Sequence, residues 1–322
     1  MTDTSTALRR PWVARLAGSG TLIGLVGLVV LFAALRPDAF ATLTNARNIL
    51  EQVAILAIIA VAQTVVMVVG DFDLSVGTLA SLVGVLTANL LLDGTAPLLA
   101  VAAGLGVGLA AGALNGLLVA YLGLSAFIAT LATMTSFGGL ALLVSGGTTL
   151  FGLPPGFVAL GQGRVAGIPV PVLVAVAVAA ALWFVLTRTV PGRLWYAVGG
   201  NSEAARLSGV NTRLVRFSAF LVSGTGAALA GILLTARLAS GHPTAADAFM
   251  LSSIAAVFLG MTLSRAGVPT IGGTAVGIGI VGVLANGLNM LQVNSYVQQV
   301  LTGAIIVAAV SLSRLSRKGR AS

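Results

Sequence analysis

Residues 52–92 decide the fold class: they read QVAILAIIAVAQTVVMVVGDFDLSVGTLASLVGVLTANLLL, and their only charged side chains are Asp71 and Asp73. An apolar run flanks the acidic pair on each side, with the roughly 20 residues that a helix needs to cross a hydrocarbon core. The apolar residues are continuous and do not alternate with polar ones, which favours helices over the strands of a barrel. The stretch therefore predicts two membrane helices joined by almost no loop.

The whole chain has the same character, since 57% of its 322 residues are hydrophobic and only 8% are charged. A soluble domain carries about 25% charged residues. The 41 glycines are tolerated in a membrane, where small residues let helices approach closely. The expected fold class is all-α, a polytopic integral membrane protein. About ten helices of spanning length are expected, near 19–36, 50–70, 73–93, 97–121, 126–145, 169–187, 215–237, 249–263, 268–290 and 295–312.

The positively charged residues predict the orientation of the chain. With the amino end in the cytoplasm, the inner side receives thirteen Arg and Lys residues and the outer side receives four, as the positive-inside rule predicts. We therefore expect a cytoplasmic segment 1–18, a transmembrane domain 19–312 and a cytoplasmic basic tail 313–322. The net charge of +9 follows from this arrangement and does not indicate a nucleic-acid partner.

Two glycine-rich segments resemble each other: residues 106–117 read GVGLAAGALNGL and residues 277–288 read GIGIVGVLANGL, with five of twelve positions identical. In the predicted topology the first runs from outside to inside and the second from inside to outside. Oppositely oriented copies indicate an inverted repeat, as in transporters that alternate access around a midplane site. The other interpretation is that glycine-rich membrane helices resemble each other by composition.

Several kinds of chemistry have no residues to support them in this sequence. The chain has no cysteine, one lysine and one histidine. It contains no G-x-x-x-x-G-K-[ST] loop for a nucleotide phosphate, no nucleophile–base motif and no ligand cluster with metal spacing. We expect no catalytic residue, no metal and no cofactor. If ATP drives transport, its hydrolysis must occur on another subunit.

The longest cytoplasmic loop, 188–214, carries the first candidate site. Asn201 or Ser202 can cap a short helix, and Glu203 then suits the positive end of the helix dipole. Gly209 suits the left-handed turn that ends such a helix. The expected element is a short charged helix on the inner membrane face. The helix is either a solvated loop helix without a partner or a docking site. The length of the loop, which is greater than a turn requires, is the feature that indicates a docking site.

The second candidate site is the break between two apolar runs at 70–77, which reads GDFDLSVG. Its glycines permit a break, and Asp73 or Ser75 can cap the helix that follows. Ionisable groups near membrane depth are costly and usually functional. The alternatives are a solvated surface turn with Asp73 as a helix cap, or proton coupling through an aspartate. The candidates for a gate or pathway element are Asp71, Asp73, Leu74, Ser75 and Gly77.

Amide side chains also lie within the predicted spans. Most are expected to hydrogen-bond neighbouring helices, and one or two to line a pathway. The pathway candidates are Asn89, Asn115, Asn286 and Asn289.

Motifs over nearly the whole of 45–312 resemble the ribose-type permeases of ABC sugar importers. Residues 70–77 resemble that family's G-G-[IF]-D-L-S-V-G, and residues 126–134, AFIATLATM, resemble its P-F-I-V-T-L-G-T-M. Residues 196–211, YAVGGNSEAARLSGVN, are similar to its Y-A-I-G-G-N-x-E-A-A-R-L-S-G-I-N loop almost residue for residue. The segment 250–290 resembles the family's final motif block. The departures are Asp71 for glycine and Ala126 for proline, and the first leaves the local role of Asp71 open.

The resemblance implies a multi-pass permease that works as a pair in the bilayer of a bacterial inner membrane, with both termini cytoplasmic. Its partners would be a cytoplasmic ABC ATP-binding subunit, an extracytoplasmic solute-binding protein and a second permease copy. We expect a homodimer, because closed two-fold pairs are the commonest assembly. The segment that couples to the ATPase would be Glu203, Ala204, Ala205, Arg206 and Gly209.

The function that these features predict is translocation of a monosaccharide, such as a ribose-, xylose- or galactose-like sugar, or a similar small polar solute, by alternating access. The same architecture for a nucleoside, an amino acid or a signalling furanone is the first alternative, because specificity rests largely with the binding protein. An ion-coupled secondary transporter using Asp71, Asp73 or Glu51 is the second, and a membrane scaffold without transport is the third.

Overall fold

The computed structural model describes residues 11–264, 267–294, 296–298, 300–301 and 303–304, with the backbone alone over 11–20. Helices coincide with nine of the ten predicted spans, and the tenth, 295–312, lies largely outside the described residues, as does the tail 313–322. The nine helices are α1 (Pro11–Leu35), α3 (Leu43–Val68), α4 (Val76–Leu92), α5 (Pro97–Gly116), α6 (Ala126–Ser145), α8 (Val170–Arg188), α11 (Thr212–Leu238), α12 (Asp247–Met261) and α13 (Ile271–Met290).

Six helical segments are long and apolar enough to cross a membrane: Leu43–Val68, Pro97–Tyr121, Ala126–Ser145, Val170–Arg188, Thr212–Leu238 and Ile271–Met290. Three further apolar helices are shorter, at Thr21–Leu35, Val76–Leu92 and Asp247–Met261. The predicted class, a helical protein with several membrane spans, is therefore confirmed. The number ten and the inverted repeat stay predictions.

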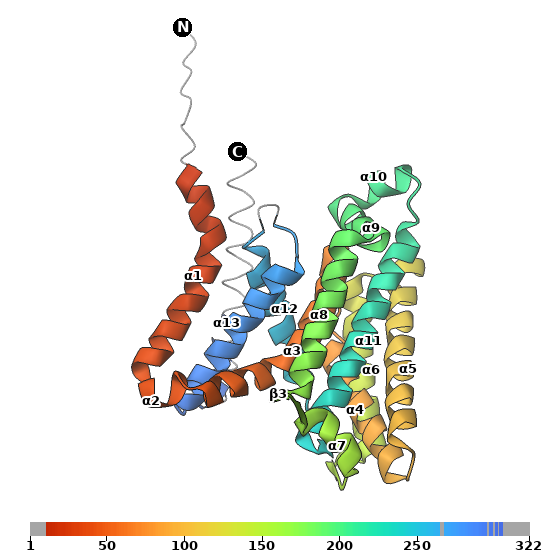
Figure 1. Ribbon diagram of the computed structural model, residues 1–322. Helices are drawn as coiled ribbons and strands as arrows, with labels where there is room; N and C mark the ends of the chain where they lie inside the picture. Colours follow the sequence, from red (N-terminus) through yellow and green to blue (C-terminus); the bar gives the residue numbers. More distant parts are fainter. Residues whose placement is uncertain (1–10, 265–266, 295, 299, 302, 305–322) are drawn as a thin grey trace.

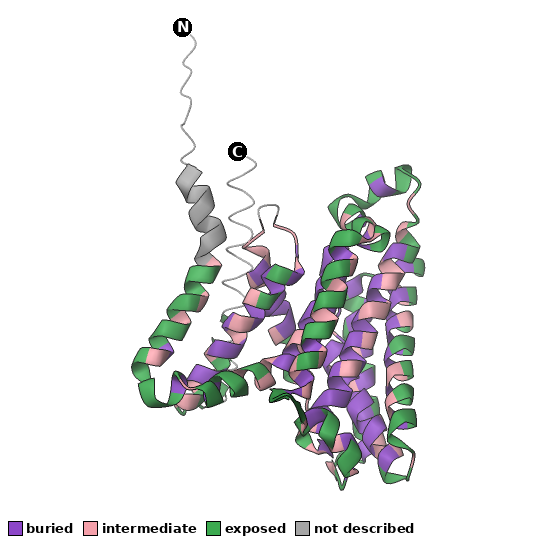
Figure 2. Cartoon of the chain, in the orientation of Figure 1, coloured by how far each residue is buried: buried purple, intermediate pink, exposed green. Residues whose placement is uncertain are grey.

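Helix α11 is the centre of the bundle, because α3, α4 and α5 all pack against it. Its contact positions are small: Gly224 opposes Gly108 and Gly112 of α5, and Gly231 opposes Ala80 of α4. A side chain at these glycines would collide with the neighbouring backbone, so glycine is what permits the close approach. Buried positions concentrate on α3, α4 and α11, while the outward faces of α5 and α8 are exposed (Figure 2).

The exposed outward faces are themselves apolar. Phe127 on α6, and Val176 and Phe184 on α8, are all more than half exposed. In water such a surface would be an aggregation hazard, whereas lipid tails solvate it without cost. The location of these side chains agrees with a bundle surrounded by lipid.

Short elements occupy both ends of the bundle (Figure 1). The α9 (Val190–Gly200) and α10 (Ser202–Leu207) helices lie at one end, and α7 (Pro155–Gln162) lies at the other. The predicted topology makes the α9–α10 end cytoplasmic. The remaining short elements are α2 (Pro37–Phe40), the π-helical continuation of α5 called η1 (Leu117–Tyr121), and two antiparallel strand pairs, β1 (Leu150–Phe151) with β4 (Ser240–Gly241) and β2 (Arg164–Val165) with β3 (Ile168–Pro169).

The two helices that carry the resembling segments run in opposite directions. Helix α5 continues through η1 to Tyr121, whose ring meets Phe217 near the start of α11 at 5.9 Å. Helix α13 instead starts near α9, where the Tyr196 hydroxyl donates to the carbonyl of Pro269 at 2.9 Å. The antiparallel course is the one that an inverted repeat requires.

Candidate coupling and gating site

The chain breaks between α3 and α4 as the sequence predicts. Gly70 has φ of +89°, a left-handed conformation that favours glycine, and residues 71–75 are not helical. Oδ1 of Asp73 accepts the Ser75 N–H at 3.0 Å, which ties down the turn before α4 begins at Val76. Gly77 is needed for another reason, since a Cβ there would lie 2.9 Å from the Ala246 carbonyl oxygen.

Asp73 is fully buried and lies at the centre of a hydrogen-bond chain. Its Oδ1 accepts the Ser75 hydroxyl at 2.6 Å, and its Oδ2 accepts the hydroxyl of Ser223 on α11 at 2.7 Å. The Ser75 hydroxyl in turn accepts from Nδ2 of Asn115 on α5 at 2.8 Å. Thr133 of α6 donates to the Asn115 Oδ1 at 2.8 Å. We call these five residues the Asp73 network; it joins the break to three helices.

The burial of both aspartates decides against one interpretation of the break. Asp73 has no exposed surface, and Asp71 is 8% exposed. A fully solvated turn at the membrane surface is therefore wrong. The break turns inward because Ser75, and Ser223 and Arg216 on α11, supply the donors that a carboxylate loses when it leaves water.

Asp71 is held separately, by an ion pair with Arg216 of α11. The Arg216 Nε donates to Oδ2 at 2.8 Å, and its terminal nitrogen donates to Oδ1 at 2.7 Å. This two-point arrangement matches the planar guanidinium to the carboxylate and is the strong form of the interaction. The Arg216 side chain keeps 32% of its surface exposed, against 10% for Asp71, so the pair lies at the edge of the core.

The other candidate amides have different environments. Asn89 is half-buried, and its Nδ2 donates to the carbonyl of Val144 at 2.9 Å, which joins α4 to α6. Asn286 is 4% exposed, and its Oδ1 has no hydrogen-bond partner among the described residues. Asn289 is exposed, and Leu74 is half-buried. Only Asn115 joins the Asp73 network.

Three members of the site were not singled out in the sequence: Thr133, Arg216 and Ser223. Ser223 and Thr133 are small hydroxyl residues in apolar spans, where most such residues bond to their own helix. Arg216 was assigned to the inner surface with the other arginines. The one signal that could have found Arg216 is the need of a buried acid for a cation, and the sequence offers several arginines for that role.

The loop 188–214, which the sequence predicts to be cytoplasmic, contains two helices where one was expected. The predicted capping is present: Asn201 Oδ1 accepts the Ala204 N–H at 2.9 Å at the start of α10, and Gly209 follows the helix with φ of +84°. Ala205 is buried, at 7% exposure. The unexpected helix α9 precedes α10 and buries Trp195, whose Nε1 donates to Ser218 of α11 at 3.0 Å.

The exposed face of α10 carries one ion pair. Arg206 donates to both oxygens of Glu203, at 3.1 Å and 2.5 Å, and both side chains are more than half exposed. The hydrogen bond from Arg206, with its positive charge, lowers the pKa of the Glu203 carboxyl. The carboxylate therefore stays ionised down to a more acidic pH than an isolated glutamate, and it remains available to a partner in water.

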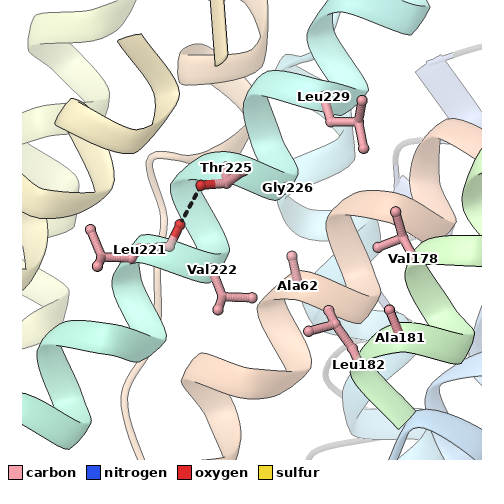
Figure 3. Close-up of a pocket in the computed structure, with 9 residues that line it drawn as sticks. All are labelled: Ala62, Val178, Ala181, Leu182, Leu221, Val222, Thr225, Gly226 and Leu229. Atoms are coloured by element: carbon pink, nitrogen blue, oxygen red, sulfur yellow. Dashed lines mark hydrogen bonds between the residues drawn. The ribbon is translucent and has the colours of Figure 1, made fainter. Parts of the chain in front are cut away.

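An apolar groove opens between α3, α8 and α11 (Figure 3). Its one polar side chain is Thr225, whose hydroxyl donates to the Leu221 carbonyl of its own helix at 2.8 Å. The groove thus offers no free polar group to a sugar, and we do not assign it to the solute. Within the described part of the chain there is also no group of three His, Cys, Asp or Glu side chains that could hold a metal.

Comparison with known proteins relates these features to transport. Residues 45–310 match the family described as branched-chain amino acid transport system / permease component. The ribose import permease protein RbsC of Bacillus subtilis (strain 168) is 42% identical over 297 residues, which cover 92% of each chain. The D-allose transport system permease protein AlsC of Escherichia coli (strain K12) is 40% identical over 300 residues, 93% of this chain and 92% of that one. The L-arabinose transport system permease protein AraH of the same strain is 34% identical over 301 residues, 94% of this chain and 92% of that one. No solved structure matches the chain.

Proposed function

Since the chain belongs to the branched-chain amino acid transport system permease family, with sugar permeases among its relatives, we propose that it is the membrane-spanning subunit of an ATP-driven importer for a monosaccharide. The observation that carries the proposal is the likeness over more than 90% of the chain to the ribose and allose permeases. Ribose, allose and arabinose are therefore the first solutes to test, with a nucleoside, an amino acid or a furanone as the alternatives.

The same proposal includes the partners. A cytoplasmic ABC ATP-binding subunit would bind α10 through its exposed face, which presents Glu203 and Arg206. Ala204 and Gly209 would shape the segment, and Ala205 would anchor it to the bundle. An extracytoplasmic solute-binding protein would dock at the opposite end, and a second identical copy would complete the pathway. The location is a bacterial inner membrane, with both termini in the cytoplasm.

The proposed mechanism is alternating access. The antiparallel course of α5 and α13 supports an inverted repeat about a midplane site, and ten spans would place both termini on one side. Asp71, Asp73, Leu74, Ser75 and Gly77 would form the gate, and Asn115 would link it to α5. Asn89, Asn286 and Asn289 stay candidates for the pathway, of which Asn286 has the unpaired buried oxygen.

The test is reconstitution of the permease in liposomes with the cassette ATPase and the binding protein that co-purify with it from its host. Mass spectrometry identifies the partners, and uptake of labelled ribose, allose and arabinose is measured with ATP or a non-hydrolysable analogue. We expect uptake that requires both partners and hydrolysable ATP. Uptake by the permease alone, abolished by a protonophore, would instead identify an ion-coupled carrier that uses the buried aspartates.

A further inference from the structure

We propose that the Asp71–Arg216 ion pair transmits movement of the α9–α10 segment to the Asp73 network, and that Arg216 is therefore a positioning residue for transport. The inference rests on the proposed function, because it assumes that an ATPase acts on α10. It goes beyond that function by assigning a role to Arg216, which belongs to none of the motifs that suggested the importer.

The connection from α10 to α11 is short and ordered. Gly209 turns the chain after α10, and Asn211 caps the next helix, with its Oδ1 accepting the Leu214 N–H at 3.1 Å. Helix α11 then continues for 27 residues to Leu238. Arg216 lies five residues after the cap, on the second turn. A displacement of α10 thus acts on the end of a long continuous helix within one or two turns of Arg216.

Helix α11 holds the break at two points. Arg216 binds Asp71, and Ser223 binds Asp73. The two α11 residues are seven positions apart, which corresponds to about two helical turns or roughly 10 Å along the axis. Residues 71–75 are not helical, and their backbone is tied to the helices only at its two ends, where the Asp71 N–H donates to the Val66 carbonyl at 3.1 Å and the Ser75 carbonyl accepts the Leu79 N–H at 2.8 Å. When α11 moves along or about its axis, the break must therefore follow it or lose one of the two attachments.

Helix α9 supports the other side of the same break. Gly199 lies directly against the Val68 carbonyl, with no room for a side chain between them, and Val68 is the last residue of α3. The Trp195 indole of α9 is bonded to Ser218 of α11. The α9–α10 segment therefore reaches the break from α3 on one side and from α11 on the other, and Asp71–Arg216 is the only ion pair between the described residues of the break and α11.

The ion pair has the properties that a transmitting contact needs. Its two parallel hydrogen bonds fix direction as well as distance, so a rotation of α11 is passed on as well as a shift. Removing one partner leaves the other charge uncompensated beside a protein core. The pair lies at the edge of the core, where the Arg216 side chain keeps 32% of its surface exposed, so it can open and close without moving a charge through the bundle.

The experiment compares uptake with ATP hydrolysis in the complete transporter, reconstituted with its cassette and binding protein. The variants are Asp71→Asn, Arg216→Gln, the double substitution and Arg216→Lys. Arg213→Gln is the matched control, because Arg213 is an exposed arginine three residues before Arg216 on the same helix. The readout is the number of solute molecules imported per ATP hydrolysed, with the amount of assembled complex measured by co-purification.

We expect both single variants to bind the cassette and hydrolyse ATP, with the import ratio lowered by about five-fold or more, the lower end of usual coupling strengths. The double variant should resemble the single ones, since either change already opens the contact. Arg216→Lys, which keeps the charge without the planar fork, should fall in between, and Arg213→Gln should retain the wild-type ratio.

Two results would overturn the inference. One is an unchanged import ratio in variants that assemble normally, which would mean that the pair transmits no movement from α11 to the break. The other is an equal loss of uptake and hydrolysis that follows the amount of folded complex, which would make its role purely structural. Failure of the wild-type complex to import with ATP is a separate result and would reject the proposed function itself.

Discussion

The carboxylate of Asp73 receives hydrogen bonds on both oxygens, from Ser75 on one and Ser223 on the other. A carboxylate within an apolar bundle is stable only while such donors are present. Beside the Ser75 N–H, the donors are two serine hydroxyls, which can rotate and exchange partners. The acid therefore forms a centre where the break is joined to α5, α6 and α11 by bonds that can be remade during a conformational change.

Replacing Asp73 by asparagine should affect transport more than replacing Asp71. The amide keeps one acceptor oxygen but loses the charge that holds two hydroxyl donors, so we expect the free energy of unfolding to fall by about 1.5–3 kcal/mol, the usual contribution of hydrogen bonds to charged groups. Uptake per assembled complex is measured for Asp73→Asn, Asp71→Asn and Asp93→Asn, which changes an exposed acid after α4. Wild-type uptake in all three would argue that the buried acid has no part in transport.

Gly209 provides a second residue-scale prediction. The left-handed conformation at φ of +84° costs an alanine about 1–2 kcal/mol. We therefore expect the turn between α10 and α11 to change conformation in the variant. We expect Gly209→Ala to weaken cassette binding and to raise the rate of proteolytic cleavage within 200–211. Gly200→Ala is the control, because that glycine has ordinary φ and open space around it. Identical cleavage of both variants would contradict the prediction.

At the scale of elements, α10 presents its charged pair outward while Ala205 anchors it. Glu203→Arg reverses one exposed charge without touching the anchor, so insertion and the thermal midpoint should stay as in the wild type. Co-purification of the cassette should fall by about ten-fold or more, since repulsion replaces attraction at an interface and each 1.4 kcal/mol is ten-fold. Asp93→Arg, a charge reversal at the opposite end, should leave it unchanged. Undiminished co-purification with Glu203→Arg would remove α10 from the cassette interface.

Long apolar elements were predictable and short ones were not. The spans 97–121 and 126–145 agree with the structure to the residue, because each is a continuous apolar run of membrane-spanning length, the feature that hydropathy detects. Helix α3 begins seven residues before its predicted start, since the Thr42 hydroxyl caps it by accepting the Asn45 N–H. Helices α7 and α9 were not predicted, because each is shorter than a membrane span and is stabilised by packing on the bundle rather than by a pattern of its own.

The candidate site was predictable in position and not in partners. The acidic break and the capped loop could be located from charge, glycine and cap residues alone. The donor from α11 could not, because Ser223 is 150 residues away from Asp73 and its hydroxyl resembles any other in an apolar helix. Burial of the break likewise depends on tertiary packing, so the sequence left the solvated turn open.

At the scale of the whole molecule, the exchange between outward and inward access should change the water exposure of the break. The chain has no cysteine, so Leu74→Cys introduces a unique thiol at a half-buried position. On switching, a conformation that is populated to about 0.1–10% becomes the dominant one. The rate at which a membrane-impermeant reagent modifies the thiol of Leu74→Cys should therefore change about ten-fold or more when the cassette is trapped with ATP. Asp93→Cys, outside the break, should react at one rate throughout. Equal rates at Leu74→Cys would show that the break does not move.

The unequal exposure of Asp71 and Arg216 also has a consequence for the evolution of the pair. An arginine alone at 216 could turn toward water, whereas an aspartate alone at 71 would be a charge with almost no surface. Of the two mutational orders that lead to the pair, the one that acquires the cation first avoids an intermediate with a lone buried acid. Descendants of the cation-first intermediate should include chains with arginine at 216 and glycine at 71, and lineages with the reverse combination should be missing.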